Sequence, residues 1–256
     1  MARENSRPSF HTKGAPDYDS ADFWDARFAA GRDVGEWLNS GDMLIGTIMA
    51  ELSKAGTDEQ PRVLHLGQAS RSWGRSSETL SLSGGGGEAN VDFSREAVRQ
   101  GKVAEQQEEP ARAMHWHCAD LLQWDSVAEL SAFAPFQVVL DKSTSDAIAT
   151  GNDRHFNRRD DPAGVCPLVQ DMLSEIPTLV LSPVELLALH LATLTHKGST
   201  WVALSYSTFR FDGLHPVIAQ FWKVRSRTGL KAPSGPVHAS THTPDVYHRI
   251  YILDRI

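Results

Sequence analysis

Cysteine is scarce in this sequence. Only Cys118 and Cys166 occur among the 256 residues, and one of them lies in an expected strand, so the chain offers no disulfide framework. Such cysteine usage is typical of reducing compartments. The first residues, Met1 to Ser6, include Glu4 and lack an apolar core, so no secretory signal is visible. We therefore expect a cytoplasmic protein, with the nucleus as a further location.

Positive charge is also limited. The chain has 25 lysine and arginine residues against 32 acidic residues, which gives a net charge of −7, and its pI is near 5.9. Nucleic-acid binding relies on clustered basic side chains that neutralise phosphates. The sequence has no such cluster, so we expect no nucleic-acid partner.

Long apolar runs are missing as well. The longest apolar stretch, Thr178 to Leu194, is interrupted by Pro183, Glu185 and His190. A membrane-spanning helix needs about 20 consecutive residues that are mainly apolar. We therefore predict that this stretch is a buried helix and that the protein has no membrane partner.

Chain length and composition predict one domain. With 256 residues, 41% of them hydrophobic and 22% charged, the chain is long enough for a single α/β domain with its own core. Residues 1–19 are polar and include Pro8, Gly14 and Pro16. We predict that they form a disordered tail and that residues 20–256 form the domain.

The most informative stretch of the chain runs from Arg62 to Gly74. Its apolar residues Val63 to Leu66 predict a short buried strand. The strand breaks at Gly67, and a glycine at the carboxyl end of a strand lets the backbone approach a ligand closely. A helix is expected next, over Gln68–Leu82, although that segment is rich in serine and only weakly periodic.

Acidic residues mark the ends of the next three expected strands. The strands and their acids are Glu88–Ser94 with Asp92, Met114–Ala119 with Asp120, and Phe136–Leu140 with Asp141. The carboxyl ends of parallel strands line one edge of a sheet, where ligands bind in such folds. The spacing between Gly67 and Asp92 is close to the one at which, in doubly wound folds, an acid at the end of the next strand binds a ribose. An acid at this position also caps the following helix, and both interpretations stay open.

Further elements follow from periodicity and capping residues. The expected helices are Ala21–Phe28 with Trp24 and Phe28 on one face, Met43–Leu52, Arg95–Gln107 with Ser94 as N-cap, and Pro183–His196. The expected later strands are Ser199–Ser207, Lys223–Lys231 and Tyr247–Leu253. Strands that alternate with helices indicate a wound α/β unit.

One segment resembles a known family. Phe136–Ile148, Phe-Gln-Val-Val-Leu-Asp-Lys-Ser-Thr-Ser-Asp-Ala-Ile, resembles the fourth motif of class I S-adenosylmethionine-dependent methyltransferases. More narrowly, it is similar to the methyltransferase-like 13 branch, which contains eukaryotic elongation factor 1A lysine methyltransferases. Asn90–Ser94 resembles the acidic second motif of that branch, and Asp22–Phe28 with Glu36 and Trp37 resembles its N-terminal aromatic segment. Ala69 and Ser143 stand where family members carry glycine.

The resemblance implies a fold, a cofactor and residue roles. The fold would be α/β, with a Rossmann-like sheet of seven mostly parallel strands, an antiparallel last strand and helices on both faces. The cofactor would be S-adenosylmethionine, without a metal. The implied cofactor-binding residues are Gly67 at the methionine moiety, Asp92 with Phe93 at the ribose, Asp120 and Leu121 at the adenine, Asp141 and Lys142 below the methionine end, and Trp24, Phe28 and Leu38 over the cofactor.

The resemblance also implies a reaction. We expect a protein-lysine N-methyltransferase, with a protein substrate similar to elongation factor 1A and with Asp141 and Trp37 as candidate catalytic residues. Together with Asp146 and Trp24, these side chains are candidates for orienting a lysine ammonium before it loses its proton. A small-molecule O- or N-methyltransferase and a catalytically weak binding protein on the same fold are the alternatives. The sequence does not indicate an oligomeric state.

Overall fold

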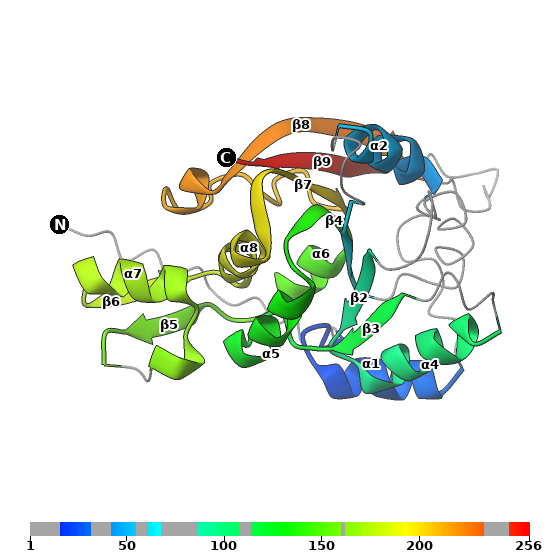
Figure 1. Cartoon of the computed structure of the whole chain (residues 1–256), viewed down its shortest axis with the longest axis horizontal. Coiled ribbons are helices and arrows are strands. Elements are labelled where there is room, and N and C mark those ends of the chain that lie inside the picture. The colour runs from blue at the N-terminus through cyan, green and yellow to red at the C-terminus, as the bar shows by residue number, and fades with distance from the viewer. Residues whose placement is uncertain are drawn as a thin grey trace, which may run out of the picture.

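A seven-stranded sheet forms the centre of the fold (Figure 1). Its strand order in the computed structural model is β3-β2-β1-β4-β7-β9-β8. The strands are β1 Val63–Leu66, β2 Glu88–Asp92, β3 His115–Cys118, β4 Phe136–Lys142, β7 Thr195–Ser205, β8 Trp222–Lys231 and β9 Tyr247–Arg255. The pairs from β3 to β7 are parallel, whereas β9 runs antiparallel to both β7 and β8. The predicted seven-stranded, mostly parallel sheet with an antiparallel last strand is confirmed.

The structure describes residues 16–31, 42–54, 61–67, 87–107, 114–159, 162–232 and 246–256. Several predictions fall outside these ranges. They concern residues 1–15 of the expected tail, the helix expected over Gln68–Leu82, and the site residues Trp37, Leu38 and Ala69.

Helices cover both faces of the sheet, as predicted. The helices are α1 Ala21–Ala29, α2 Asp42–Leu52, α4 Arg95–Glu105, α5 Trp124–Glu129, α6 Thr144–Ile148, α7 Pro167–Glu175 and α8 Pro183–Leu194, with short 3₁₀ turns at Leu130–Phe133, Pro162–Gly164 and Ile218–Gln220. On one face, Leu44 and Ile48 of α2 pack against Val138 and Val202. On the other face, α5 and α8 pack in a larger cluster that includes Trp201. Burial of these apolar faces is the main stabilising contribution to the layered core.

A small second sheet was not expected from the sequence. β5 (Arg154–Asn157) and β6 (Thr178–Leu181) pair in antiparallel fashion, and in Figure 1 they lie with α7 at the left of the molecule, beyond α8 and α5 as seen from β4. The prediction of one helix over Thr178–Leu194 is therefore wrong in its first turn. Side chains alternate between exposed and buried along β6, which is the period of a strand. The helix α8 begins at Pro183, as expected for the helix Pro183–His196, because Ser182 and Glu185 form a capping box there.

The described part of the chain contains no helix that is both long and apolar enough to cross a membrane.

Candidate cofactor site

The predicted cofactor residues gather at one edge of the sheet. Gly67, Asp92 and Asp141 lie at the carboxyl ends of β1, β2 and β4, and Asp120 lies two residues beyond β3. These four strands are adjacent and parallel, so their ends meet at the same edge, called the carboxyl edge below. In open α/β sheets this is the edge at which ligands bind.

Position 67 favours glycine for two reasons, namely its backbone conformation and the lack of room for a Cβ atom. Its φ is +73°, a left-handed conformation that costs a residue with a Cβ atom about 1–2 kcal/mol. In addition, a Cβ atom at this position would collide with the hydroxyl of Thr144. That hydroxyl donates a hydrogen bond of 2.7 Å to the carbonyl of Leu66. Close packing of α6 on the end of β1 thus accounts for the glycine before any ligand is considered.

Asp92 and Asp25 organise the start of α4. The Asp92 carboxylate accepts a hydrogen bond of 2.7 Å from the backbone N–H of Ser94. Asp25 of α1 accepts from the Ser94 hydroxyl at 2.5 Å and from the Glu96 backbone N–H at 3.0 Å, and these hydrogen bonds lower the pKa of Asp25. Ser94 also caps α4, as predicted, by accepting from Ala97 N–H. The N-terminal helix is therefore fixed beside the predicted ribose acid.

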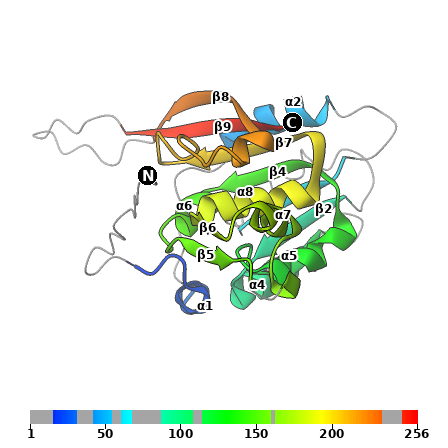
Figure 2. The ribbon, with the colours of Figure 1, turned by 90° about the vertical axis from the view of Figure 1, so that its left-hand side faces the viewer.

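The N-terminal segment contacts the rest of the domain at two separate places. The Asp19 side chain lies next to Gly151, just beyond α6. At the other end of α1, Gln100 of α4 donates a hydrogen bond of 3.0 Å to the carbonyl of Phe28, and α1 lies alongside α4 (Figure 2). Trp24 is half-buried and donates from its indole nitrogen to the carbonyl of Tyr18 at 2.9 Å. This placement is compatible with the cover over the cofactor predicted for Trp24 and Phe28.

The loop after β3 carries the predicted adenine-binding pair. Asp120 accepts a hydrogen bond of 2.9 Å from Leu122 N–H, which forms a tight turn. Leu121 is buried, and its carbonyl lies 2.8 Å from Nδ1 of His190 in α8. Burial lowers the pKa of His190, and Nδ1 donates to this carbonyl because a carbonyl oxygen can only accept. No local sequence pattern connects His190 with this loop, because the two are 69 positions apart and meet only in the fold.

Phe93 and Lys142, the remaining predicted cofactor residues, also lie at the carboxyl edge. Phe93 directly follows Asp92 and is half-buried, and Lys142 ends β4 and is buried. The carbonyl of Phe93 accepts a weak hydrogen bond of 3.7 Å from the Cys118 thiol at the end of β3.

Asp141 is completely buried at the end of β4. One carboxylate oxygen accepts from Ser145 N–H at 3.1 Å. The other oxygen, Oδ2, and the Ser145 hydroxyl are buried with no hydrogen-bond partner among the described residues. Burial raises the pKa of Asp141 to about 6. Hydrogen bonding from the side chain and backbone of Ser145 partly opposes this rise, so Asp141 is held against the start of α6.

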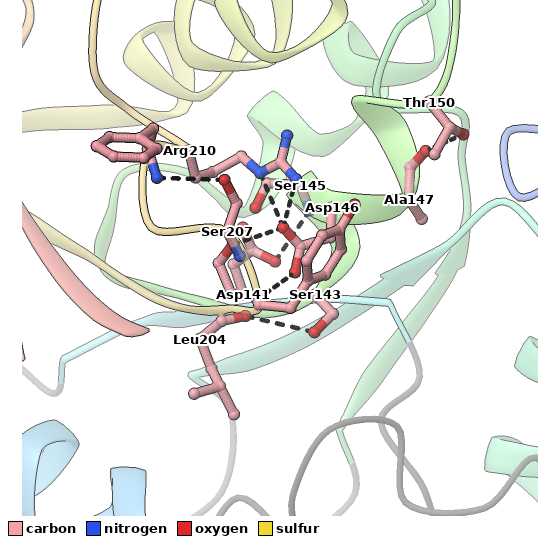
Figure 3. A network of polar contacts seen from close by, with 12 residues as sticks. Asp141, Ser143, Ser145, Asp146, Ala147, Thr150, Leu204, Ser207 and Arg210 are labelled. Carbon is pink, nitrogen blue, oxygen red and sulfur yellow. Dashed lines mark hydrogen bonds and ion pairs between the residues drawn. The ribbon is translucent and has the colours of Figure 1, made fainter. Parts of the chain in front are cut away.

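Asp146 is the centre of a network that the sequence did not reveal (Figure 3). Its carboxylate binds the Arg210 guanidinium at 2.7 Å and accepts from the Ser205 hydroxyl at 2.5 Å and from Tyr206 N–H at 3.0 Å. The side chains of Asp146 and Arg210 are 2% and 12% exposed. This network joins α6 to the segment that follows β7, at the carboxyl edge.

Comparisons with known proteins find methyltransferases among the relatives and among the solved structures with a similar fold. No family model matches the chain. The chain is 28% identical over 245 residues to the methyltransferase srdJ of Neurospora crassa, an alignment that covers 94% of this chain and 86% of that protein.

Solved structures share the fold. The SAM-dependent methyltransferase from Anabaena variabilis has a TM-score of 0.54 at 9% identity, with 92% of this chain and 95% of that chain covered. The N-methyltransferase NodS from Bradyrhizobium japonicum, in complex with S-adenosylhomocysteine, has a TM-score of 0.50 at 11% identity, with 94% and 99% covered. The chain has the fold of class I S-adenosylmethionine-dependent methyltransferases. A protein from a study of thioacetal formation during echinomycin biosynthesis has a TM-score of 0.52 at 14% identity, with 92% and 93% covered.

These comparisons support an S-adenosylmethionine-dependent methyltransferase and support S-adenosylmethionine as its cofactor. The described residues fit that group. The donor carries an ammonium group at its methionine end, and Asp141 Oδ2 is a buried carboxylate oxygen without a hydrogen-bond partner among the described residues. The individual roles of the predicted site residues and the methyltransferase-like 13 branch stay predictions.

Proposed function

We propose that the protein transfers a methyl group from S-adenosylmethionine to an oxygen or nitrogen atom of a small molecule. Two structurally similar proteins support this choice. NodS is an N-methyltransferase, and another neighbour comes from a study of echinomycin biosynthesis. The relative from Neurospora crassa is also a methyltransferase.

The state of Asp146 is the observation that carries the choice of acceptor. A lysine has an unperturbed pKa near 10.4 and arrives as an ammonium ion, which favours a site with an available carboxylate. Asp146 is neutralised by Arg210 and also binds Ser205 and Tyr206. Asp141 is buried, and its free oxygen fits the ammonium group of the donor. An acceptor without positive charge matches these two carboxylates better than a lysine does.

Methyl transfer from a sulfonium needs little acid–base catalysis by the protein. Bound S-adenosylmethionine supplies an electrophilic methyl group on a sulfonium. The chain would bind the ribose through Asp92 and the adenine through Asp120, and would exclude water with α1. Asp141 and Ser145 would fix the methionine end, so that the methyl group is held in one place.

A protein lysine acceptor is the second candidate. It rests on the similarity of Phe136–Ile148 to the methyltransferase-like 13 branch, whose members include elongation factor 1A lysine methyltransferases. In this alternative, Asp141 and Trp37 would act at the lysine.

Two measurements test the proposal. Calorimetric titration with S-adenosylhomocysteine should show binding to the intact chain, and Asp92→Ala should weaken it at least tenfold, because a hydrogen-bonded carboxylate is lost. Asp125→Asn changes an exposed acid of α5 and should leave the affinity unchanged. No heat of binding up to millimolar ligand would contradict the methyltransferase assignment.

The acceptor class is tested by radiolabelled methyl transfer in a cell extract that is then separated into protein and small-molecule fractions. We expect the label in the small-molecule fraction. Label confined to protein, at lysine, would support the second candidate instead.

A further inference from the structure

We propose that the imidazole of His248 accepts the proton of a hydroxyl group on the methyl acceptor. This inference rests on the small-molecule activity proposed above, and it narrows the acceptor atom from an oxygen or nitrogen to a hydroxyl oxygen. His248 belongs to β9 and is not among the site residues that the family resemblance implies.

The strand register places His248 at the carboxyl edge. β9 runs antiparallel to β7, so the first residues of β9 lie beside the last residues of β7. Ser205, the last residue of β7, pairs with Arg249, and His248 is the next residue beyond that pair. On the other side of β7, Leu204 pairs with Lys142 at the end of β4. His248 therefore lies two strands away from the end of β4, where the methionine end of the donor is expected.

The imidazole is buried at this position. His248 is 6% exposed, and its Nδ1 atom is buried without a hydrogen-bond partner among the described residues. The facing residue on β8 is Leu230, which packs with the apolar cluster between α2 and the sheet. His190, by contrast, uses its Nδ1 to bind the Leu121 carbonyl. The described contacts thus give His190 a role in holding the fold and give the Nδ1 atom of His248 none.

Burial and one carboxylate act on the charge of His248. Burial lowers the pKa of His248, so the neutral ring predominates at neutral pH, and the negative charge of Asp146 acts in the opposite direction. Asp146 is fixed in place by Arg210 at 2.7 Å. The other titratable side chains at this end of β4, β7, β8 and β9 are Asp141, Lys142, Tyr206, Lys231, Tyr247 and Arg249. A neutral ring can accept a proton, and the resulting imidazolium would be stabilised by the Asp146 carboxylate.

A hydroxyl acceptor has a proton to lose before or during the transfer. A neutral amine attacks with its lone pair and releases its proton afterwards, whereas a hydroxyl oxygen is a weak nucleophile until its proton leaves. In the proposed step, the hydroxyl proton moves to His248 while the oxygen forms a bond to the methyl carbon. The carbon–sulfur bond breaks and its electron pair stays on sulfur, which gives S-adenosylhomocysteine. The imidazolium then releases the proton to water.

Chemical rescue tests whether His248 acts as a base. Initial rates of radiolabelled methyl transfer into the small-molecule fraction of a cell extract are measured with saturating S-adenosylmethionine. His248→Ala and His248→Gln should each lower the rate about a hundredfold. Added imidazole should raise the rate of His248→Ala about tenfold, whereas 1,2,4-triazole, a ring of the same size and a much weaker base, should not.

His155→Ala is the matched control, because it removes an exposed imidazole of β5 and should leave the rate unchanged. The affinity for S-adenosylhomocysteine, measured by calorimetry, should be the same in all three variants, since the proposed role of His248 concerns the acceptor. A rate in His248→Ala close to that of the unmodified protein, equal rescue by both rings, or a parallel loss of S-adenosylhomocysteine affinity would each overturn the role of His248. No transfer to small molecules by the unmodified protein would instead contradict the proposed function, so the two failures are separable.

Two measurements on the unmodified protein need no substitution. In isotope-labelled protein saturated with S-adenosylhomocysteine, the assigned imidazole resonance of His248 should titrate in NMR spectra at a pKa below that of a free histidine. A ring that is charged at neutral pH would exclude the role of a base. The labelled product should be a methyl ether, from which hydriodic acid releases the label as volatile methyl iodide. Label retained on nitrogen would overturn the hydroxyl acceptor.

Discussion

Substituting Gly67 tests whether the contact between the end of β1 and Thr144 leaves no room for a side chain. In Gly67→Ala, the new methyl group enters a backbone with φ of +73° and collides with the Thr144 hydroxyl. Gly213 is a matched control, because its φ is +70° and nothing lies within 4 Å of an added Cβ atom. Gly213→Ala therefore reports the backbone strain alone.

The expected costs follow from these two environments. The left-handed conformation costs alanine about 1–2 kcal/mol at either site. At Gly67 the displaced Thr144 hydroxyl also loses its hydrogen bond to the Leu66 carbonyl, which adds about 1–2 kcal/mol. The effect of alanine on the unfolded chain is the same at both sites and cancels in the difference. We therefore expect Gly67→Ala to lower the free energy of unfolding by about 1–2 kcal/mol more than Gly213→Ala does.

Urea unfolding of both variants, alone and combined with Thr144→Ala, measures this difference. Removing the hydroxyl makes room for the methyl group, so Gly67→Ala should cost about 1 kcal/mol less in the Thr144→Ala background. Strict additivity, or equal costs for Gly67→Ala and Gly213→Ala, would refute the reasoning.

Three further predictions concern the carboxyl edge. Ser143 has a φ of +67°, so Ser143→Gly should raise the free energy of unfolding by about 0.5–1 kcal/mol in urea, and a loss of stability would contradict this. Burial raises the pKa of Asp141 from 3.8 to about 6. Above pH 6 the buried carboxyl of Asp141 is ionised and destabilises the folded protein, whereas below pH 4 it is protonated and has no such effect. The stability gained by Asp141→Asn relative to the unmodified protein should therefore grow between pH 4 and pH 6, by about 3 kcal/mol, and a difference independent of pH would exclude this shift. His190→Leu removes the hydrogen bond to the Leu121 carbonyl and should weaken S-adenosylhomocysteine binding about threefold to tenfold in calorimetry. An unchanged affinity would show that the loop after β3 keeps its binding conformation without this hydrogen bond.

Much of the main sheet could be predicted from local pattern. β1 and β4 are short runs of apolar residues, and the closing strand β9 is rich in aromatic and β-branched residues, so their side-chain chemistry alone favours strands. The β5–β6 pair was missed because the four residues of β5 are mostly exposed and give no hydrophobic signal. The segment Thr178–Leu181 joins apolar residues of α8 in the sequence, and only its pairing with β5 shows that it is a strand.

The acids of the site could be predicted because strand ends are local features. Asp141 follows the apolar run of β4, and Asp92 stands directly before Phe93 and the helix cap Ser94. Parallel pairing brings such strand ends to one edge, whatever the loops between them. Their partners could not be predicted in the same way. Arg210 binds Asp146 across 64 positions of sequence, and no periodicity links the two residues.

The sequence by itself determined which residues end the strands of this protein, and through them the methyltransferase fold. The tertiary structure decided what each of those residues can do. The fold pairs Asp146 with Arg210, so that this carboxylate is not available to an acceptor, and it buries one oxygen of Asp141 without a partner among the residues that the structure describes. The physical reason is that solvation and pairing of a charge depend on its neighbours in space, which the order of residues along the chain does not specify.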